Sequence, residues 1–414
     1  MTIHFLVYVN PFASEGASAS RWRSVVDGLA KQGAKTKLII TGGWSSSSEF
    51  QKYNSKGYID FDKKIAYEYI SGKKNFNLWS RRINMYFFDY ISIPILSLRL
   101  IKGLKKERVD IIFLQPYLNV FRLFSFGLKK LPDEMKVIME INEYNDIALE
   151  HATNYFQKKN VEKFNTLLFS KILPNLDALI VMTDKLKSHF SNICSNNKQL
   201  PLYHMPMTVD LSRFAMVKSD DSYSSPYIAY CGTTSFKKDG IDILIKSFDK
   251  IADSFPDLIL YIAAYFENDG QKMLDLIKKS DFSERIIYLG TLPGEKIPAF
   301  VSNATLCALP RPDSRQAQGG FPTKLGEYLA SGCPVCVTSV GEIPLYLKDK
   351  ESAFFAEPGS IESFATVMKN VLLDRKLAYE VGLKGKLVAE KTFNKDIQGE
   401  NLFKYLSNLI NDAK

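Results

Sequence analysis

Cysteine and histidine are both scarce in this chain of 414 residues, which contains five cysteines and four histidines. The cysteines are odd in number and irregularly spaced, which argues against a disulfide framework and favours a reducing compartment. Cys333 and Cys336 have the C-x-x-C spacing of redox and zinc sites, but no second pair accompanies them. Because they border an apolar run, we expect two buried structural cysteines. The histidines show no metal-ligand spacing and no suitable loop carries Asp-x-Asp, so we expect no metal and no cofactor.

Long hydrophobic runs are missing too. The most apolar internal stretch, residues 90–98, is much shorter than the roughly 18 residues that a membrane-spanning helix needs. Residues 1–9 have no basic region before their apolar run and no small-residue cleavage site. They are therefore expected to form a first strand rather than a signal peptide, and we expect a cytoplasmic protein that is not integral to a membrane.

The charge balance is only mildly basic, with 54 Lys and Arg against 45 Asp and Glu, a net charge of +9. This excess is spread along the chain and fits anionic lipid, nucleotide phosphates or nucleic acid equally well. No nucleic-acid recognition module or stacking motif is visible, so no nucleic-acid partner is expected. The hydrophobic content of 46% is typical of a folded protein, and the length favours two domains.

Strand-length apolar runs alternate with helix-length segments in both halves of the chain. In the first half the expected strands are residues 3–9, 37–40, 111–114, 137–141 and 178–182. In the second half they are residues 227–230, 258–263, 286–289, 305–309 and 334–338. Such alternation predicts parallel sheets covered on both faces, hence an α/β protein with two Rossmann-like domains.

A polar stretch, residues 218–226, interrupts the alternation and indicates a linker. We expect a first domain over 1–205, a linker over 206–225 and a second domain over 226–392. Residues 393–414 are expected to form a helix that crosses back to the first domain. Ligands of such folds bind beyond the carboxyl ends of the strands, so a cleft between the two facing domains is expected.

The most informative segment begins after the strand at 305–309. It contains Gly319, Gly320, Phe321, Pro322 and Thr323, followed by Lys324 and Glu327. Glycines let a backbone approach a ligand closely, and proline suits a first helical turn. Lys324 and Glu327 are three residues apart and so share one face of the helix that starts here. The helix N-terminus suits a diphosphate, and a carboxylate one turn on could accept hydrogen bonds from ribose hydroxyls. A solvated Lys–Glu pair on an ordinary helix is the alternative.

This segment resembles the donor-binding signature of the retaining GT-B glycosyltransferases of the large bacterial group 1, or family 4, type. Three further segments are similar to motifs of that family and occur in the same order: the interdomain segment 208–214, the loop 230–245 and the closing loop 340–344. Residues 178–187 also resemble the last strand and helix of the family's first domain.

The resemblance implies roles for individual residues. Glu327 matches the ribose-binding glutamate, and Lys324 with Gly319–Thr323 stands where the family holds diphosphate and sugar. Lys238, or its neighbour Lys237, matches the phosphate-binding lysine, and Gly232 opens that loop. Thr291 and Leu292 follow a strand whose backbone contacts the base in the family. Lys238 and Lys324 would neutralise charge on the leaving diphosphate.

Two positions depart from the family pattern. Many relatives carry a second glutamate where this chain has Gly319, and an arginine where it has Thr233. Arg311 or Arg315 could take over part of the phosphate contact.

The first domain is expected to hold the acceptor. Gly16 lies in a loop resembling the family's glycine-containing loop after the first strand. After the strand at 137–141 the family often has a histidine, which is absent here. Glu140 and Glu143 are the polar groups expected to face the cleft, with Glu143 placed in the catalytic set. A capping or solvated role for Glu143 is the alternative.

Residues 79–108 carry seven basic and two acidic side chains, a net +5, interleaved with aromatic residues. A helix of this kind can lie on an anionic membrane surface, or it can pack on a core with a solvated basic side. The lipid-linked acceptors of the resembled family favour a peripheral position at the inner face of the plasma membrane.

Together these features predict a retaining hexosyltransferase-type glycosyltransferase. It would move a sugar from an NDP-sugar to a glycan or lipid-linked glycan in bacterial surface polysaccharide synthesis. Two alternatives stay open: a non-catalytic nucleotide-sugar-binding partner of another transferase, and a GT-B-like nucleotide-sugar epimerase.

Overall fold

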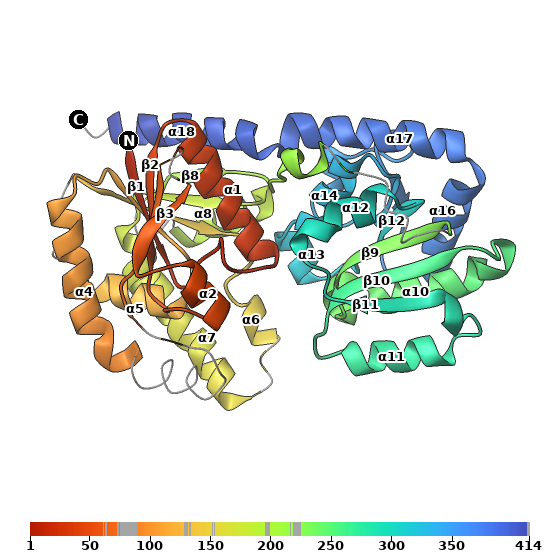
Figure 1. Ribbon diagram of the computed structural model, residues 1–414, viewed down its shortest axis with the longest axis horizontal. Helices are drawn as coiled ribbons and strands as arrows, with labels where there is room; N and C mark the ends of the chain where they lie inside the picture. Colours follow the sequence, from red (N-terminus) through yellow and green to blue (C-terminus); the bar gives the residue numbers. More distant parts are fainter. Residues whose placement is uncertain are drawn as a thin grey trace. The chain divides into compact units, whose positions relative to one another are not determined.

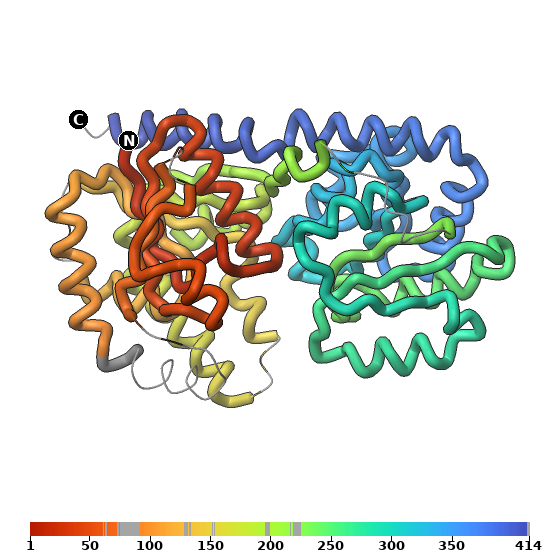
Figure 2. Tube along the Cα trace, viewed as in Figure 1, coloured from red at the N-terminus to blue at the C-terminus, as the bar shows by residue number. Residues whose placement is uncertain are grey.

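The computed structural model describes residues 1–411 except 61, 63, 73, 75–88, 128–130, 132–133, 151, 153, 195–198, 216 and 218–224. The chain divides into two compact units. Unit 1 comprises Met1–Met205 together with Gln398–Lys414, and unit 2 comprises Pro206–Ile397 (Figure 2).

Unit 1 contains an eight-stranded sheet in the order β3-β4-β2-β1-β5-β6-β7-β8. Its strands are β1 (Thr2–Val7), β2 (Lys35–Ile40), β3 (Lys56–Asp60), β4 (Ile65–Tyr69), β5 (Ile111–Leu114), β6 (Lys136–Ile141), β7 (Ala178–Val181) and β8 (Leu202–His204). All neighbouring strands pair in parallel except β3 and β4, which are antiparallel at one edge. The sheet is therefore parallel as expected except at this edge, where β3 returns directly to β4 without a crossover helix.

The helices of unit 1 cover both faces of its sheet (Figure 1). They are α1 (Ala17–Lys31), α2 (Ser47–Lys52), α4 (Asp89–Lys106), α5 (Leu118–Gly127), α6 (Ile147–Glu150), α7 (Tyr155–Leu167), α8 (Asp184–Cys194) and most of α18 (Lys395–Asn411). The alternation of β1 sends Phe5 into a core with Trp22 of α1 and Leu402 of α18, and sends Leu6 into a second core with Phe121 of α5.

Unit 2 contains a six-stranded parallel sheet in the order β11-β10-β9-β12-β13-β14. Its strands are β9 (Tyr227–Thr233), β10 (Ile259–Tyr265), β11 (Ile286–Gly290), β12 (Leu306–Leu309), β13 (Val335–Thr338) and β14 (Phe354–Ala356). Its helices are α9 (Phe236–Asp239), α10 (Ile241–Ile251), α11 (Gly270–Lys279), α12 (Ile297–Ser302), α13 (Arg315–Gly319), α14 (Thr323–Ser331), α15 (Ile343–Tyr346), α16 (Ile361–Leu373) and α17 (Arg375–Val388). β9 is central, so its carboxyl end lies where the strand order turns from β10 to β12.

Two neighbouring segments differ from the sequence-based boundaries. Residues 207–209, placed in the linker, are buried in unit 2, and the peptide groups of Val209 and Phe393 pair there. A short 3₁₀ turn, Leu211–Phe214, follows them.

Among the helices of the described residues, none is both long enough and apolar enough to cross a membrane.

Candidate functional site

The centre of the site is an ion pair between α14 and α9. The ammonium Nζ of Lys324 lies 2.6 Å from Oδ2 of Asp239, and both side chains are largely shielded from solvent. Asp239 ends the four-residue helix α9, and Lys324 lies in the first turn of α14. The strand–helix alternation therefore brings together two residues that are far apart in the chain.

Asp239 is held from a second side by the end of β9. Its Oδ2 accepts hydrogen bonds from the backbone N–H of Thr233 at 3.1 Å and from the Thr233 hydroxyl at 2.9 Å. Burial acts to raise the pKa of Asp239, but the Lys324 ammonium together with the charges of Arg311 and Lys238 outweighs it and holds that pKa at about 2. For Lys324, burial outweighs the attraction of Asp239 and lowers its pKa, and the charges of Lys238 and Arg311 add to this lowering.

Two glycines allow neighbouring groups of the site to lie very close to the backbone. A Cβ on Gly232 would lie 2.3 Å from Nζ of Lys324, so any larger residue would displace the ammonium group. Gly240 follows Asp239 at φ +70°, and a Cβ there would lie 2.0 Å from the carbonyl oxygen of Pro310. The predicted role of Gly232 as the opening of this loop therefore has a local steric basis.

Arg311 ties the two loops of the site together. Its side chain is 4% exposed, and it donates to the carbonyl oxygens of Lys238 at 3.4 Å and Gly320 at 3.3 Å. Arg311 and Lys238 both act on the charge of Asp239, so three cations and one carboxylate share this corner. Arg315 begins α13 and is exposed. Lys237 is exposed on α9.

The predicted glycine segment has a conformation that any residue could adopt. Gly319 ends α13, and Gly320 caps that helix with φ −111° and ψ 154°. Phe321 is buried, and its ring packs against Tyr346 and Phe393, so its side chain supports the loop instead of facing a ligand. The assignment of this segment to the donor site stays a prediction.

The N-terminus of α14 is free of a side-chain cap. Pro322 is the N-cap residue, its side chain makes no capping hydrogen bond, and Thr323 is the first helical residue. The exposed N–H groups of such a turn carry partial positive charge. These N–H groups, with the side chains of Lys324, Lys238 and Arg311 around Asp239, are here called the cationic corner. Such a corner suits phosphate oxygens.

Glu327 lies one turn further along α14 and is bound by an arginine. Nη1 of Arg213 lies 2.5 Å from Oε1 of Glu327, while Nη2 of Arg213 donates to the carbonyl oxygen of Gly294 at 2.5 Å. Gly294 follows the loop in which Thr291 is exposed and Leu292 half-buried, after the end of β11 at Gly290. Arg213 therefore connects the predicted ribose ligand to the predicted base-contacting loop.

Unit 2 matches a known protein family. Residues 225–374 match the family model described as glycosyl transferases group 1. Unit 2 carries a group 1 glycosyltransferase domain. This domain includes every residue of the cationic corner, and the resemblance stated from the motifs is confirmed at the level of the family.

A curated relative matches part of the chain. A GDP-mannose-dependent α-(1-6)-phosphatidylinositol monomannoside mannosyltransferase of Mycolicibacterium smegmatis is 24% identical over 221 residues, covering 50% of this chain and 56% of that protein. The match thus spans little more than half of that relative.

Solved structures resemble the whole chain. Sucrose-phosphate synthase from Thermosynechococcus elongatus superposes with a TM-score of 0.76 at 15% identity, covering 100% of both chains. Anabaena HepE in complex with UDP-glucose gives 0.70 at 13% identity, covering 99% of this chain and 100% of that one. These likenesses confirm two Rossmann-like α/β domains, the GT-B fold.

The predicted acceptor-side residues all belong to unit 1, which lies outside the matched residues 225–374. Gly16 is exposed and is the N-cap residue of α1, at φ +99°. Glu143 is exposed in the loop after β6. Glu140 is fully buried, and Nε and Nη2 of Arg21 donate to its Oε1 at 2.8 and 2.6 Å. Its expected orientation toward an acceptor is therefore wrong, because Arg21 holds the carboxylate in the core.

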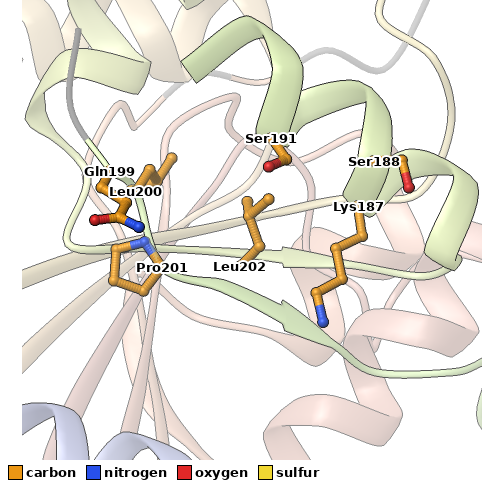
Figure 3. Close-up of a pocket in the computed structure, with 7 residues that line it drawn as sticks. All are labelled: Lys187, Ser188, Ser191, Gln199, Leu200, Pro201 and Leu202. Carbon is orange, nitrogen blue, oxygen red and sulfur yellow. The ribbon is translucent and has the colours of Figure 1, made fainter. Parts of the chain in front are cut away.

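Other candidate features lie away from the cationic corner. Cys333 and Cys336 are buried free thiols. A shallow pocket of about 660 Å³ lies in unit 1 beside α8 and β8, lined by residues that include Lys187, Ser191 and Leu202 (Figure 3). It contains none of the predicted site residues, and its few polar side chains do not converge on one point.

The sequence reasoning missed Asp239, Arg213 and the structural role of Arg311. Asp239 left a signal in the pattern Lys-Lys-Asp-Gly, where a carboxylate stands between a lysine and a glycine of a phosphate loop. Arg213 stands in the segment 208–214, which was matched to the family without a role for its arginine.

Proposed function

We propose that the protein is a retaining glycosyltransferase that uses an NDP-sugar donor and a glycan or lipid-linked glycan acceptor. The observation that carries this proposal is the cationic corner of unit 2: Lys324 beside Asp239, with Lys238, Arg311 and the uncapped N-terminus of α14. Such a corner suits a nucleoside diphosphate, whose negative charge increases when the sugar leaves.

The reaction exchanges one C–O bond for another. The bond between the anomeric carbon and the β-phosphate oxygen breaks, and the acceptor hydroxyl oxygen bonds to that carbon on the same face. The hydroxyl proton passes to the departing diphosphate. Lys324, Lys238 and the N–H groups of α14 stabilise the diphosphate as its charge develops. This scheme uses no metal ion.

The pairing of Lys324 with Asp239 positions the ammonium without consuming all its donors. An ammonium has three N–H groups, and Asp239 takes one of them at 2.6 Å. Glu327 lies on the same helix, one turn from Lys324, where it can accept from ribose hydroxyls as its contact with Arg213 rearranges.

The comparisons support the chemical class. The mycolicibacterial relative is described as acting with GDP-mannose on a phosphatidylinositol mannoside, and HepE was solved with UDP-glucose. A hexosyl donor, a lipid-linked acceptor and a role in bacterial surface polysaccharide synthesis follow as parts of the proposal.

Association with a membrane is a further part of the proposal. Of the basic stretch 79–108, residues 79–88 lie outside the described part of the chain. On α4, Ile95, Leu98, Arg99 and Lys102 are exposed, which supports contact with an anionic lipid surface. The corresponding location is the cytoplasm, with peripheral attachment at the inner face of the plasma membrane.

Calorimetric titration with UDP-, GDP-, ADP- and dTDP-sugars tests the donor site. Selective binding by the wild type, lost in Glu327→Ala, is the expected result. Equal binding by both proteins, or no binding at all, would show that the donor assignment is wrong. The control Glu400→Ala alters an exposed carboxylate of α18 and should bind as the wild type does.

Transfer is tested separately, with labelled donor and NMR of the product anomer. A product with the donor's anomeric configuration is expected in the presence of a chelator. An inverted product would overturn retention, and loss of transfer with chelator would overturn metal independence. Donor binding without any transfer would favour a non-catalytic partner, and an epimerised donor would favour an epimerase.

A further inference from the structure

Helix α17 of unit 2 has an unusual distribution of side-chain sizes. Its buried side chains are small: Ala378, Val381, Gly382 and Gly385. Its large apolar side chains are exposed, namely Leu377 37%, Tyr379 63%, Leu383 42% and Leu387 49%. A helix that covers a core normally buries its leucines and exposes its small and polar residues, so α17 shows the reverse arrangement.

The small side chains fix α17 tightly on unit 2. A Cβ on Gly382 would lie 2.3 Å from the carbonyl oxygen of Gly332, and one on Gly385 would lie 2.6 Å from that of Ser352. The N-terminus is capped by Asp374, whose carboxylate accepts from the N–H of Leu377 at 3.0 Å. The helix is therefore rigidly seated, and the exposure of its leucines does not come from loose packing.

Three of the exposed residues form a continuous line. Tyr379, Leu383 and Leu387 follow one another at intervals of four, so their side chains lie one above the other on one face, here called the α17 stripe. Single exposed apolar residues are ordinary on protein surfaces, whereas an aligned group marks a contact surface. The stripe lies beyond residues 225–374, the part matched by the family model.

Basic side chains border the α17 stripe. The helix carries four basic residues and one acidic residue, a net +3, and Lys376 and Lys384 are exposed beside the stripe. A second copy of the chain docked through a twofold axis would set these lysines against each other. An anionic lipid surface would instead pair them with headgroups while the leucines enter the acyl boundary. Tyrosine is favoured at that depth.

We propose that the α17 stripe, with Lys376 and Lys384, is a docking surface for an anionic lipid bilayer. This places a lipid contact on unit 2, in addition to the one proposed for α4 of unit 1. It does not depend on which sugar or nucleotide the protein binds.

Sedimentation with vesicles tests the inference on the full chain. Vesicles of phosphatidylcholine alone are compared with vesicles containing equal amounts of phosphatidylcholine and phosphatidylglycerol. The wild type should bind the anionic vesicles only, and less well at high salt. Leu383→Ser with Leu387→Ser should lower the partition coefficient by about tenfold or more, because less apolar surface enters the bilayer. Lys376→Glu with Lys384→Glu should have a similar effect.

Matched control variants show whether the loss of binding is specific to the α17 stripe. Leu345→Ser removes an equally large apolar side chain that is 70% exposed on α15, and it should bind vesicles as the wild type does. Because Leu383 and Leu387 are exposed, the double variant should keep the wild-type melting temperature and nucleotide affinity. Three results would overturn the inference: no binding by the wild type, undiminished binding by both α17 variants, or loss of binding only with Leu98→Ser on α4. A dimer in solution that Leu383→Ser and Leu387→Ser dissociate would assign the stripe to a second copy instead.

Discussion

Oδ2 of Asp239 receives the ammonium group of Lys324 at 2.6 Å and two hydrogen bonds from Thr233. A carboxylate thus stands inside a corner otherwise made of cations. Its function there is to keep Lys324 charged and in place, because burial and the nearby charges of Lys238 and Arg311 all disfavour the protonated amine.

Asp239→Asn should therefore lower the pKa of Lys324 further and remove its charge at moderately alkaline pH. We expect the alkaline limb of the profile of kcat/KM against pH to move to lower pH. At pH values above the shifted limb, kcat/KM should fall by at least about tenfold. The profile is measured with the best donor from the calorimetric panel. Asp242→Asn, which alters a half-buried carboxylate of α10, serves as the control and should leave the profile unchanged. An unshifted limb in Asp239→Asn would show that Asp239 does not set the charge of Lys324.

Arg213 should set the donor KM, because it holds Glu327 and the carbonyl of Gly294 together. Arg213→Ala is expected to raise the donor KM by about tenfold with a smaller change in kcat, since the ribose and base contacts lose their preset orientation. Arg213→Lys should restore little of the donor affinity, because an ammonium lacks the planar arrangement of N–H groups that makes both contacts. Lys246→Ala removes an exposed cation from α10 and provides the comparison. A donor KM unaffected by Arg213→Ala would leave this residue with a purely structural role.

Arg21 and Glu140 should matter for the stability of unit 1 and not for catalysis directly. Glu140→Gln leaves a buried arginine without its counter-charge, which should cost about 3–5 kcal/mol of unfolding free energy. Glu400→Gln breaks an exposed pair on α18 and should cost less than about 1 kcal/mol. Urea unfolding monitors both. Should Glu140→Gln instead keep full stability while losing acceptor turnover, the carboxylate would be an acceptor ligand after all.

His4 should make unit 1 sensitive to acid. Burial outweighs the neighbouring Glu107 and lowers the pKa of His4 from 6.5 to about 4. Because the folded-state pKa lies below the unfolded one, the stabilisation is complete above pH 6.5 and is lost as the pH falls toward 4. We expect the free energy of unfolding to fall by about 3 kcal/mol across this pH window, as measured by urea unfolding at a series of pH values. In His4→Gln the dependence of the unfolding free energy on pH that is due to this group should vanish. The same dependence in both proteins would assign it to other residues.

The strands and helices of both units were largely predictable, because long apolar runs with period-two or helical spacing leave few alternatives. The core strands β5 and β6 agree with the sequence-based ranges to within about a residue, and α14 begins in the segment where the sequence placed a helix N-terminus. The antiparallel strand β3 was not predicted. Its sequence, Lys56–Asp60, contains glycine and charged residues and is only partly buried, so it lacks the apolar run that identifies an inner strand.

The sequence by itself placed Lys324 and Glu327 of the predicted donor site on one face of one helix, because they lie three residues apart and this spacing is local. It could not determine their partners. Asp239 meets Lys324 across 85 positions, and Arg213 meets Glu327 across 114. Likewise Glu140 appears as a polar residue at a strand end in the sequence, and only the packing of α1 against β6 brings Arg21 to it. Pairings of this kind depend on how sheets and helices stack, and stacking is decided by the whole core.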